Sequence, residues 1–158
     1  GSLLRDYAVL LHGWLPPSRG EVDARLRRAE AAGPGSVVSP QGRPARTRLK
    51  LLAHASREGE AFSLAALRIA AGRRQQTRAH TGHVGHPLVH DGAYTSLEAF
   101  GADGRWWTRC ALHRCRLAFR DGRGALREVA DPLPQDFTAA LAALRGRDGA
   151  SRSRTSWR

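Results

Sequence analysis

The sequence predicts an α+β fold with a mixed, largely antiparallel sheet and flanking helices. Three observations support this prediction. Several segments alternate between apolar and polar side chains, which is typical of half-buried strands. Polar turns join two pairs of such segments, which favours antiparallel hairpins. Two further segments have helical spacing or apolar residues on one helical face, and glycine or proline bounds each of them.

The chain begins with a strand and then a helix. Residues 7–11 alternate, and this strand ends at Gly13, shortly before a pair of prolines. Residues 21–32 have a helical composition that ends in a Gly-Pro-Gly breaker. We therefore expect a helix over 21–32 and a loop over 33–45.

The middle of the chain predicts a strand pair and a second helix. Residues 47–53 alternate, and after a polar turn the run 62–69 returns, so the two should pair antiparallel. The alanines of the second run would also suit a helix on propensity alone, so the expected strand over 62–70 rests partly on the resemblance described below. Residues 75–84 have helical spacing and are closed by Gly85 and Pro87.

The last third predicts a hairpin and an amphipathic helix. Residues 112–119 alternate, an Asp-Gly-Arg-Gly turn reverses the chain, and residues 126–130 return as a strand. Residues 136–144 carry apolar side chains on one helical face. We assign 1–144 to one domain and expect 145–158, with five arginines among small polar residues, to be a disordered basic tail.

Composition indicates a polyanionic partner. The 158 residues include 26 Lys and Arg against 14 Asp and Glu, a formal net charge of +12, and 41% are hydrophobic. This length suits one domain with a true core. The positive charge favours nucleic acid before a membrane surface, and no apolar run approaches the roughly 18 residues of a membrane span. Every cationic residue except Lys50 is arginine, so an arginine is informative only where its position is specific.

Cysteine and methionine usage add two expectations. Cys110 and Cys115 are too few for a disulfide framework, which favours a reducing intracellular compartment, cytoplasmic or organellar. Together with His113 they would supply part of a zinc site, but a closed site needs four ligands, and the histidines of 80–90 have another explanation below. We therefore predict no metal. The chain starts at Gly1 and contains no methionine, which suggests a piece of a longer protein.

The segment 72–94 is the most informative stretch. Its residues run from Gly72-Arg-Arg-Gln-Gln-Thr-Arg78-Ala-His80 through Gly85-His-Pro87 to Asp91 and Tyr94. This string resembles the signature of the RluA-type pseudouridine synthases, in which Thr-Gly-Arg-x-His-Gln-Ile-Arg-x-His precedes Gly-His-Pro and Gly-Asp-x-x-Tyr-Gly. The chain departs from that pattern, as a divergent member would, at Ala71, Gln75, Thr77, His90 and Thr95.

The resemblance extends over 7–144, with further motifs in the order of the family. The first strand is similar to the Tyr-x-Ala-Leu-Val-x-Gly strand of the family. Ala45-Arg46-Thr47 is similar to its Ala-x-Thr, Leu112-His113 to its Leu-His-Ala, and Asp131-Pro-Leu-Pro134 to its Ala-Pro-Leu-Pro. We identify the chain as a member of this family and expect the C-terminal part of a pseudouridine synthase catalytic domain.

The resemblance implies isomerisation of uridine to pseudouridine in ribosomal or transfer RNA, without a metal or redox cofactor. In the family an aspartate in a His-Arg-Leu-Asp segment attacks a flipped-out uridine, and no segment of this chain matches it. Tyr7 matches the active-site tyrosine that packs against the target base. Arg78 matches the arginine that pairs with the catalytic carboxylate. We therefore expect Arg78 to bind the nucleophilic aspartate, and no segment of this chain supplies that residue. A core tyrosine and a solvated helix arginine are the ordinary alternatives for these two positions.

Three residues are candidates for contact with RNA. Arg73 and Arg74 stand at the predicted strand-to-helix turn, where a helix N-terminus and a cation together favour phosphate. Trp106 lies in a polar stretch with Trp107, and such residues stack on bases, although we expect at least one of the two to be buried. Structural roles are expected for the remaining motif residues, which are Gly72, His80, Gly85, Pro87, Asp91 and Tyr94.

Two other readings remain. A noncatalytic RNA-binding remnant of the fold would keep the sheet and the basic surface but lack the nucleophile. A small basic ribosomal protein ranks last, because the ordered motifs would then be coincidence. The sequence leaves the oligomeric state and the identity of the target uridine open.

Overall fold

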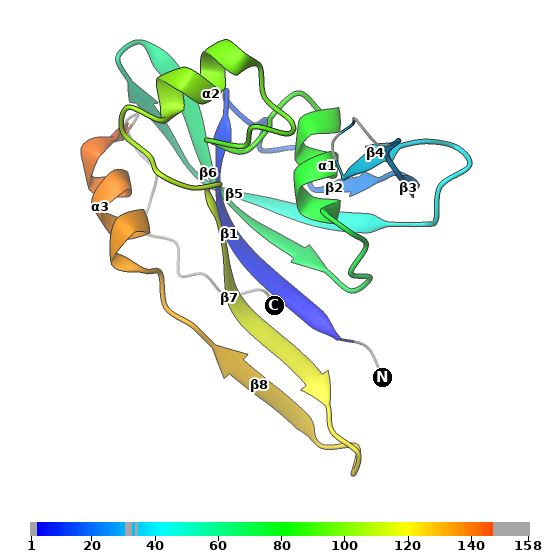
Figure 1. Cartoon of the computed structure of the whole chain (residues 1–158). Helices are drawn as coiled ribbons and strands as arrows, with labels where there is room; N and C mark the ends of the chain where they lie inside the picture. Colours follow the sequence, from blue (N-terminus) through cyan, green and yellow to red (C-terminus); the bar gives the residue numbers. More distant parts are fainter. Residues whose placement is uncertain (1–2, 31–32, 34, 147–158) are drawn as a thin grey trace.

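The computed structural model of the chain describes residues 3–30, 33 and 35–146, and a long antiparallel sheet is its main element (Figure 1). The strands are β1 (Leu4–His12), β2 (Glu21–Asp23), β3 (Leu26–Arg28), β4 (Ser36–Val38), β5 (Arg46–Arg57), β6 (Glu60–Ile69), β7 (Leu112–Arg120), β8 (Leu126–Ala130) and β9 (Arg145–Gly146). The helices are α1 (Gln76–His83), α2 (Leu97–Asp103) and α3 (Gln135–Ala143). None of these helices is long and apolar enough to cross a membrane.

The main sheet has seven strands in the order β2-β5-β6-β1-β7-β8, with β9 added to β5. Every pairing among the described strands is antiparallel, which confirms the predicted sheet type. The predicted hairpins are confirmed as β5–β6 and β7–β8. The first one turns through Glu58 and Gly59, both at positive φ, as a two-residue hairpin loop requires.

The alanine-rich run of β6 is a strand because it pairs on both sides, with β5 and with β1. Its Ala65 and Ala66 are buried and leave room for larger side chains on neighbouring strands. Burial and pairing therefore outweigh the helix propensity of these alanines. The run lies at the centre of the sheet and fixes the position of β1.

The two faces of the sheet carry separate apolar clusters. Val9 and Leu11 of β1 belong to a cluster on one face, and the adjoining Thr47 on that face bonds to α1. Leu10 belongs to a cluster on the opposite face together with Phe137 of α3. Because strand residues alternate between faces, α1 and α3 cover opposite sides of the sheet.

The predicted helix over 21–32 is wrong. The structure has β2 and β3 there, and the expected loop over 33–45 contains β4, which pairs with β3. Val22 and Leu26 are buried as β2 joins β5 and β3 joins β4. Pairing of these short strands therefore outweighs the helical composition.

Two other elements differ from expectation. α2 occupies a region for which the sequence predicted no element, and the Ser96 side chain caps it by accepting a hydrogen bond from the Ala99 N–H. The first two residues of the predicted tail, Arg145 and Gly146, form β9. The rest of that tail, 147–158, lies outside the described residues.

Candidate active site

α1 begins and ends at residues with left-handed or turn conformations. Gln75 precedes it at φ 49°, and Gly85 follows it at φ 83°. The His86 N–H then donates to the Thr81 carbonyl oxygen at 2.9 Å, and this bond closes the last turn. The predicted helix end at Gly85 and Pro87 is thereby confirmed, and the chain is led back past α1 to Asp91.

Arg78 of α1 forms a two-pronged ion pair with Asp91. Its Nε lies 2.8 Å from Oδ2 of Asp91 and its Nη2 2.5 Å from Oδ1. The Asp91 side chain is fully buried, while 23% of the Arg78 side chain is exposed. The hydrogen bond to Asp91 raises the pKa of Arg78 above its ordinary value, so the guanidinium stays charged. The sequence predicted an arginine whose carboxylate partner was missing, and the structure instead pairs it within the chain.

Asp91 also shapes the loop in which it lies. Its backbone carbonyl accepts from the N–H groups of Tyr94 and Thr95, both at 3.0 Å, and its Oδ1 accepts from the N–H of Ala93 at 3.2 Å. These hydrogen bonds fix the shape of the loop, which is the structural role expected for Asp91. The loop in turn places the Tyr94 ring 5.3 Å from the Arg78 guanidinium carbon.

Tyr94 connects the site to β4. Its hydroxyl accepts from the Ser36 N–H at 3.1 Å and lies 2.9 Å from the Ser36 carbonyl oxygen and 3.0 Å from Oε1 of Gln75. Burial raises the pKa of Tyr94, so the phenol is neutral near pH 7. Tyr94 therefore fixes one side of Arg78.

Cys110 lies on the other side of Asp91. Its Sγ is 3.8 Å from Oδ2 of Asp91, and burial, followed by the charge of that carboxylate, raises the pKa of the thiol to about 12. The thiol is therefore protonated near pH 7 and is a poor nucleophile. Among the described residues, Cys110 and Cys115 are both free thiols, and no three His, Cys, Asp or Glu side chains gather as metal ligands.

Tyr7 lies on β1, opposite Leu67 of β6 and Arg114 of β7. It is partly buried and packs against the same apolar cluster as Cys110, which places both on the α1 face. It also borders a cavity of about 640 Å³ that Asp6 lines. The structure thus puts Tyr7 and Arg78 on the same sheet face, and the role of Tyr7 toward a base stays a prediction.

The turn before α1 holds Gly72, Arg73 and Arg74. A Cβ on Gly72 would lie 3.0 Å from the guanidinium carbon of Arg5, a tight contact that the flexible arginine side chain would relieve by a small shift. The Arg73 Nε–H donates to the Pro44 carbonyl oxygen at 3.2 Å, whereas Arg74 is exposed. Their contact with RNA stays a prediction, and Arg74 has the more accessible side chain.

Trp106 and Trp107 follow α2 and point to different environments. Trp107 is 3% exposed and meets the Phe137 ring edge to face at 5.1 Å. Trp106 is partly exposed, and the Arg57 guanidinium carbon lies 5.2 Å from its ring centroid. The expectation that at least one tryptophan is buried is confirmed. Stacking of a base on Trp106 stays a prediction, and Arg57 occupies one position over that ring.

His80 fixes α1 against the sheet. Its Nε2 lies 2.9 Å from the Ala24 carbonyl oxygen, so Nε2 carries the proton, and Nδ1 accepts from the Thr47 hydroxyl at 2.8 Å. The side chain is fully buried, and burial lowers its pKa below 6.5. A structural role, as predicted for this residue, accounts for both nitrogens.

We expect the free energy of unfolding to fall as the pH drops below about 6.5, because His80 takes up a proton more readily in the unfolded chain. The contribution of the buried neutral imidazole is fully present above that pH. Urea denaturation at about pH 7.5 and about pH 5.5 measures it. In His80→Gln the free energy of unfolding should change less between these two pH values than in the exposed control His83→Gln. Equal changes in the two variants would contradict the assignment of this pH dependence to His80.

Sequence reasoning missed a buried ion-pair network on the opposite face. Asp6 is 3% exposed and accepts from Arg68 at 2.6 and 2.8 Å and from Arg116 at 3.0 Å. Arg116 also donates to Glu128 at 2.6 Å. Burial raises the pKa of Asp6, but the hydrogen bonds and charges of the two arginines together lower it below 3.8. The register places Asp6 opposite both arginines, and only the strand pairing reveals that.

Comparisons with known proteins agree with the resemblance found in the motifs. No family model matches the chain. Ribosomal large subunit pseudouridine synthase D of Haemophilus ducreyi is 30% identical in an alignment of 152 positions that covers 90% of this chain and 45% of the relative. The Escherichia coli protein of that name is 29% identical, with the same coverage. An uncharacterized RNA pseudouridine synthase of Chloroflexus aurantiacus is 33% identical over 89% of the chain and 42% of its own length.

Solved structures show the same relationship. Human RNA pseudouridylate synthase domain containing 1 superposes with a TM-score of 0.77 and 25% identity over 92% of this chain and 60% of that chain. Human RNA pseudouridylate synthase domain containing 4, at 18% identity and a TM-score of 0.65, shares the fold. The chain spans less than half the length of these curated relatives. With its motifs in order on this fold, the chain belongs to the RluA-type pseudouridine synthase family.

Proposed function

We propose that this chain forms the C-terminal part of the catalytic domain of an RNA pseudouridine synthase, which isomerises uridine in ribosomal or transfer RNA. The observation that carries the proposal is the position of Arg78, a charged guanidinium in a mostly buried setting on the same sheet face as Tyr7. The name of several relatives, ribosomal large subunit pseudouridine synthase D, favours ribosomal RNA as the substrate.

The reaction exchanges one bond of the nucleoside for another. The N1–C1′ bond breaks, the uracil rotates, and a C5–C1′ bond forms, while C5 loses a proton and N1 gains one. In this proposal an aspartate from a His-Arg-Leu-Asp segment, which this chain does not contain, is the nucleophile. Tyr7 packs against the uracil and accepts the C5 proton. The uridine leaves its stack to reach the site, as bases do in other base-modifying enzymes.

Arg78 keeps a further N–H donor for that second carboxylate. Its ion pair with Asp91 uses Nε and Nη2, and among the described residues no hydrogen bond involves Nη1. A guanidinium has five N–H donors in a fixed plane, so one edge binds Asp91 while the remaining donors face a substrate-side carboxylate. Asp91 then orients Arg78, and Arg78 keeps the nucleophile ionised in a site of low water content.

A polypeptide that joins this chain to the amino-terminal portion of a relative tests the proposal. The substrate is RNA with tritium at C5 of uridine, because pseudouridine formation releases that hydrogen to water. We expect tritium release by the joined protein and none by the variant with Asn in place of the His-Arg-Leu-Asp aspartate. Absence of release from ribosomal and transfer RNA alike, by a folded protein, would contradict the proposed activity.

A noncatalytic RNA-binding remnant is the second candidate function. It is favoured by the Arg78–Asp91 pair, which already supplies this arginine with a carboxylate. The same experiment separates the two candidates. RNA binding without tritium release by the joined protein indicates the remnant, and release indicates the enzyme.

A further inference from the structure

The face of β5 that points away from α1 carries a row of cations. Thr47 of β5 bonds to His80 of α1, so the alternate residues Arg46, Arg48 and Lys50 lie on the opposite face. Successive members of this row are about 6.6–6.8 Å apart along the strand, which is twice the rise per residue. Lys50 is the single lysine of the sequence, so a general preference for arginine does not account for the row.

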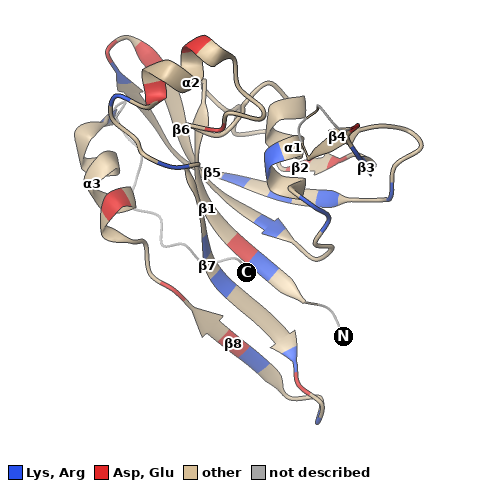
Figure 2. Ribbon diagram, in the orientation of Figure 1, with Lys and Arg blue, Asp and Glu red and all other residues tan. Residues whose placement is uncertain are grey.

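A fourth cation adjoins the row from the next strand. Arg68 of β6 is the cross-strand partner of Arg48, and like charges directly opposite each other in a sheet are unfavourable. Asp6 holds Arg68 in place by two hydrogen bonds. Figure 2 shows basic residues along β5 and near the end of β6. Asp6 already neutralises part of the charge of Arg68, and an anion between Arg48 and Arg68 would add a second counter-charge.

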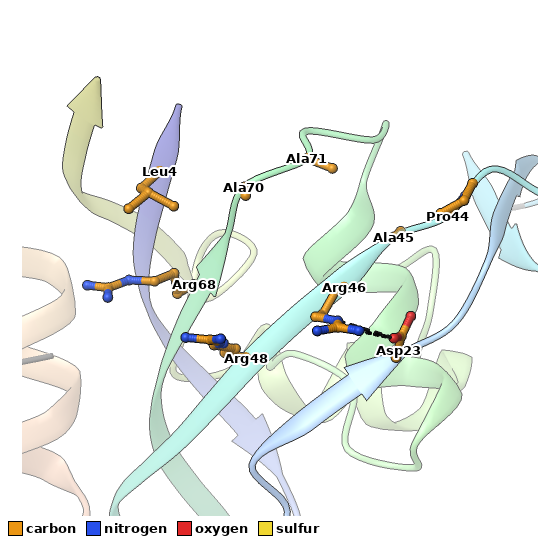
Figure 3. Close-up of a pocket in the computed structure, with 9 residues that line it drawn as sticks. All are labelled: Leu4, Asp23, Pro44, Ala45, Arg46, Arg48, Arg68, Ala70 and Ala71. Atoms are coloured by element: carbon orange, nitrogen blue, oxygen red, sulfur yellow. Dashed lines mark hydrogen bonds and ion pairs between the residues drawn. The ribbon is translucent and has the colours of Figure 1, made fainter. Parts of the chain in front are cut away.

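Space for such an anion is present. A groove of about 490 Å³ runs beside these side chains, and the small residues Ala70 and Ala71 line it at the end of β6 (Figure 3). Arg46, Arg48 and Arg68 line it against a single carboxylate, Asp23. The groove lies on the sheet face opposite the Arg78–Asp91 pair, and Arg68 also lines the cavity that Tyr7 borders, so the two hollows adjoin.

The carboxylates of β2 do not close this groove to an anion. Asp23 binds Arg46 at 2.7 Å, and Glu21 lies 3.5 Å from Nε of Arg46 and 4.0 Å from Nε of Arg48. The side chains of Arg46 and Arg48 are 60% and 62% exposed, and exposed ion pairs of this kind are weak and screened by salt. A phosphate, which accepts two parallel N–H donors from a guanidinium, competes well with them.

We propose that the cation row, defined as Arg46, Arg48, Lys50 and Arg68, binds successive phosphates of the RNA backbone. This inference rests on the proposed function, because it takes RNA as the partner, and it adds a second contact surface on the far side of the sheet. RNA held there passes around the start of β5 and the end of β6, where Arg73 and Arg74 lie, toward the candidate active site. The cation row contacts only phosphates of the RNA backbone, so it does not distinguish one base from another.

Salt-dependent RNA affinity tests the row in the full 158-residue chain. The probe is fluorescently labelled single-stranded oligouridine, and the variant is the double substitution Arg48→Gln with Lys50→Gln. Each lost phosphate contact lowers the slope of log affinity against log salt by about 0.7, so the pair lowers it by about 1.4. That difference corresponds to about 25-fold weaker binding at about 0.1 M salt.

The matched control is the double substitution Arg123→Gln with Arg127→Gln at the tip of the β7–β8 hairpin. It removes the same charge, and Arg127 is 60% exposed and paired with Asp121 much as Arg46 is paired with Asp23. A loss confined to the row variant supports the inference. Equal losses in both variants overturn it and leave the RNA partner standing, whereas no RNA binding by the unaltered chain overturns the inference and counts against the proposed function. Circular dichroism and melting confirm that each variant is folded.

Discussion

Replacing Arg78 with methionine is expected to reduce pseudouridine formation by the joined protein at least about 10²–10³-fold, because the nucleophile then lacks the cation that keeps it ionised, and loss of one preorganised donor commonly costs about this much. The same substitution leaves Asp91 fully buried without its cation. Breaking a buried ion pair from one side costs about 3–5 kcal/mol in the free energy of unfolding. Lost activity alone therefore does not distinguish a catalytic arginine from a structural one.

A second variant separates the two effects. Arg78→Met combined with Asp91→Leu removes both charges, and exchange of a buried pair for apolar side chains is often neutral for stability. We expect this double variant to regain most of the stability in urea denaturation while tritium release stays absent. Arg78→Lys keeps the charge but loses the two-pronged geometry. Its tritium release should therefore lie between that of the unaltered joined protein and that of Arg78→Met. Recovery of tritium release in the double variant would show that Arg78 acts only by holding Asp91.

The sequence predicted those parts of the fold where pattern and pairing agree. β5 and β7 alternate, and polar turns join them to the returning runs that form β6 and β8, so the local sequence indicates both hairpins, although the alanines of β6 also suit a helix. β2, β3 and β4 are three residues long and have no pattern of their own. They become strands because β2 adds to the edge of β5, and because β3 and β4 pair with each other, and tertiary pairing of this kind is not visible in composition.

The candidate site was predictable in its residues but not in its connections. The motif order singled out Arg78, Asp91 and Tyr94, and the structure brings them together around α1. That Asp91 is the partner of Arg78 follows from the loop after α1, in which Gly85 turns the chain back. Cys110 joins this site from a distant segment, and its contact with Asp91 had no signal in the sequence.

The ion-pair network around Asp6 predicts a large effect on stability. Asp6→Asn should lower the free energy of unfolding by about 3–5 kcal/mol near pH 7, because Arg68 and Arg116 then share no carboxylate at the centre of the sheet. Their side chains are 17% and 28% exposed, so solvent screens the loss only in part. Asp121→Asn, which removes a carboxylate from the hairpin turn that contacts Arg127, is the matched control and should change stability little.

The pH dependence of this effect identifies its cause. The two arginines hold the pKa of Asp6 below its ordinary value of 3.8, so the stabilisation from the carboxylate is fully present above that pH. It is lost as the pH falls through the lowered pKa, because the unfolded chain then binds the proton first. The difference in stability between the unaltered protein and Asp6→Asn, followed by urea denaturation, should therefore shrink in acid. A difference that stays constant down to about pH 2 would mean that the asparagine acts through packing and not through the lost carboxylate charge. Burial alone raises the pKa of a carboxyl group, so a difference that shrinks in acid below pH 3.8 identifies the two arginines as the cause.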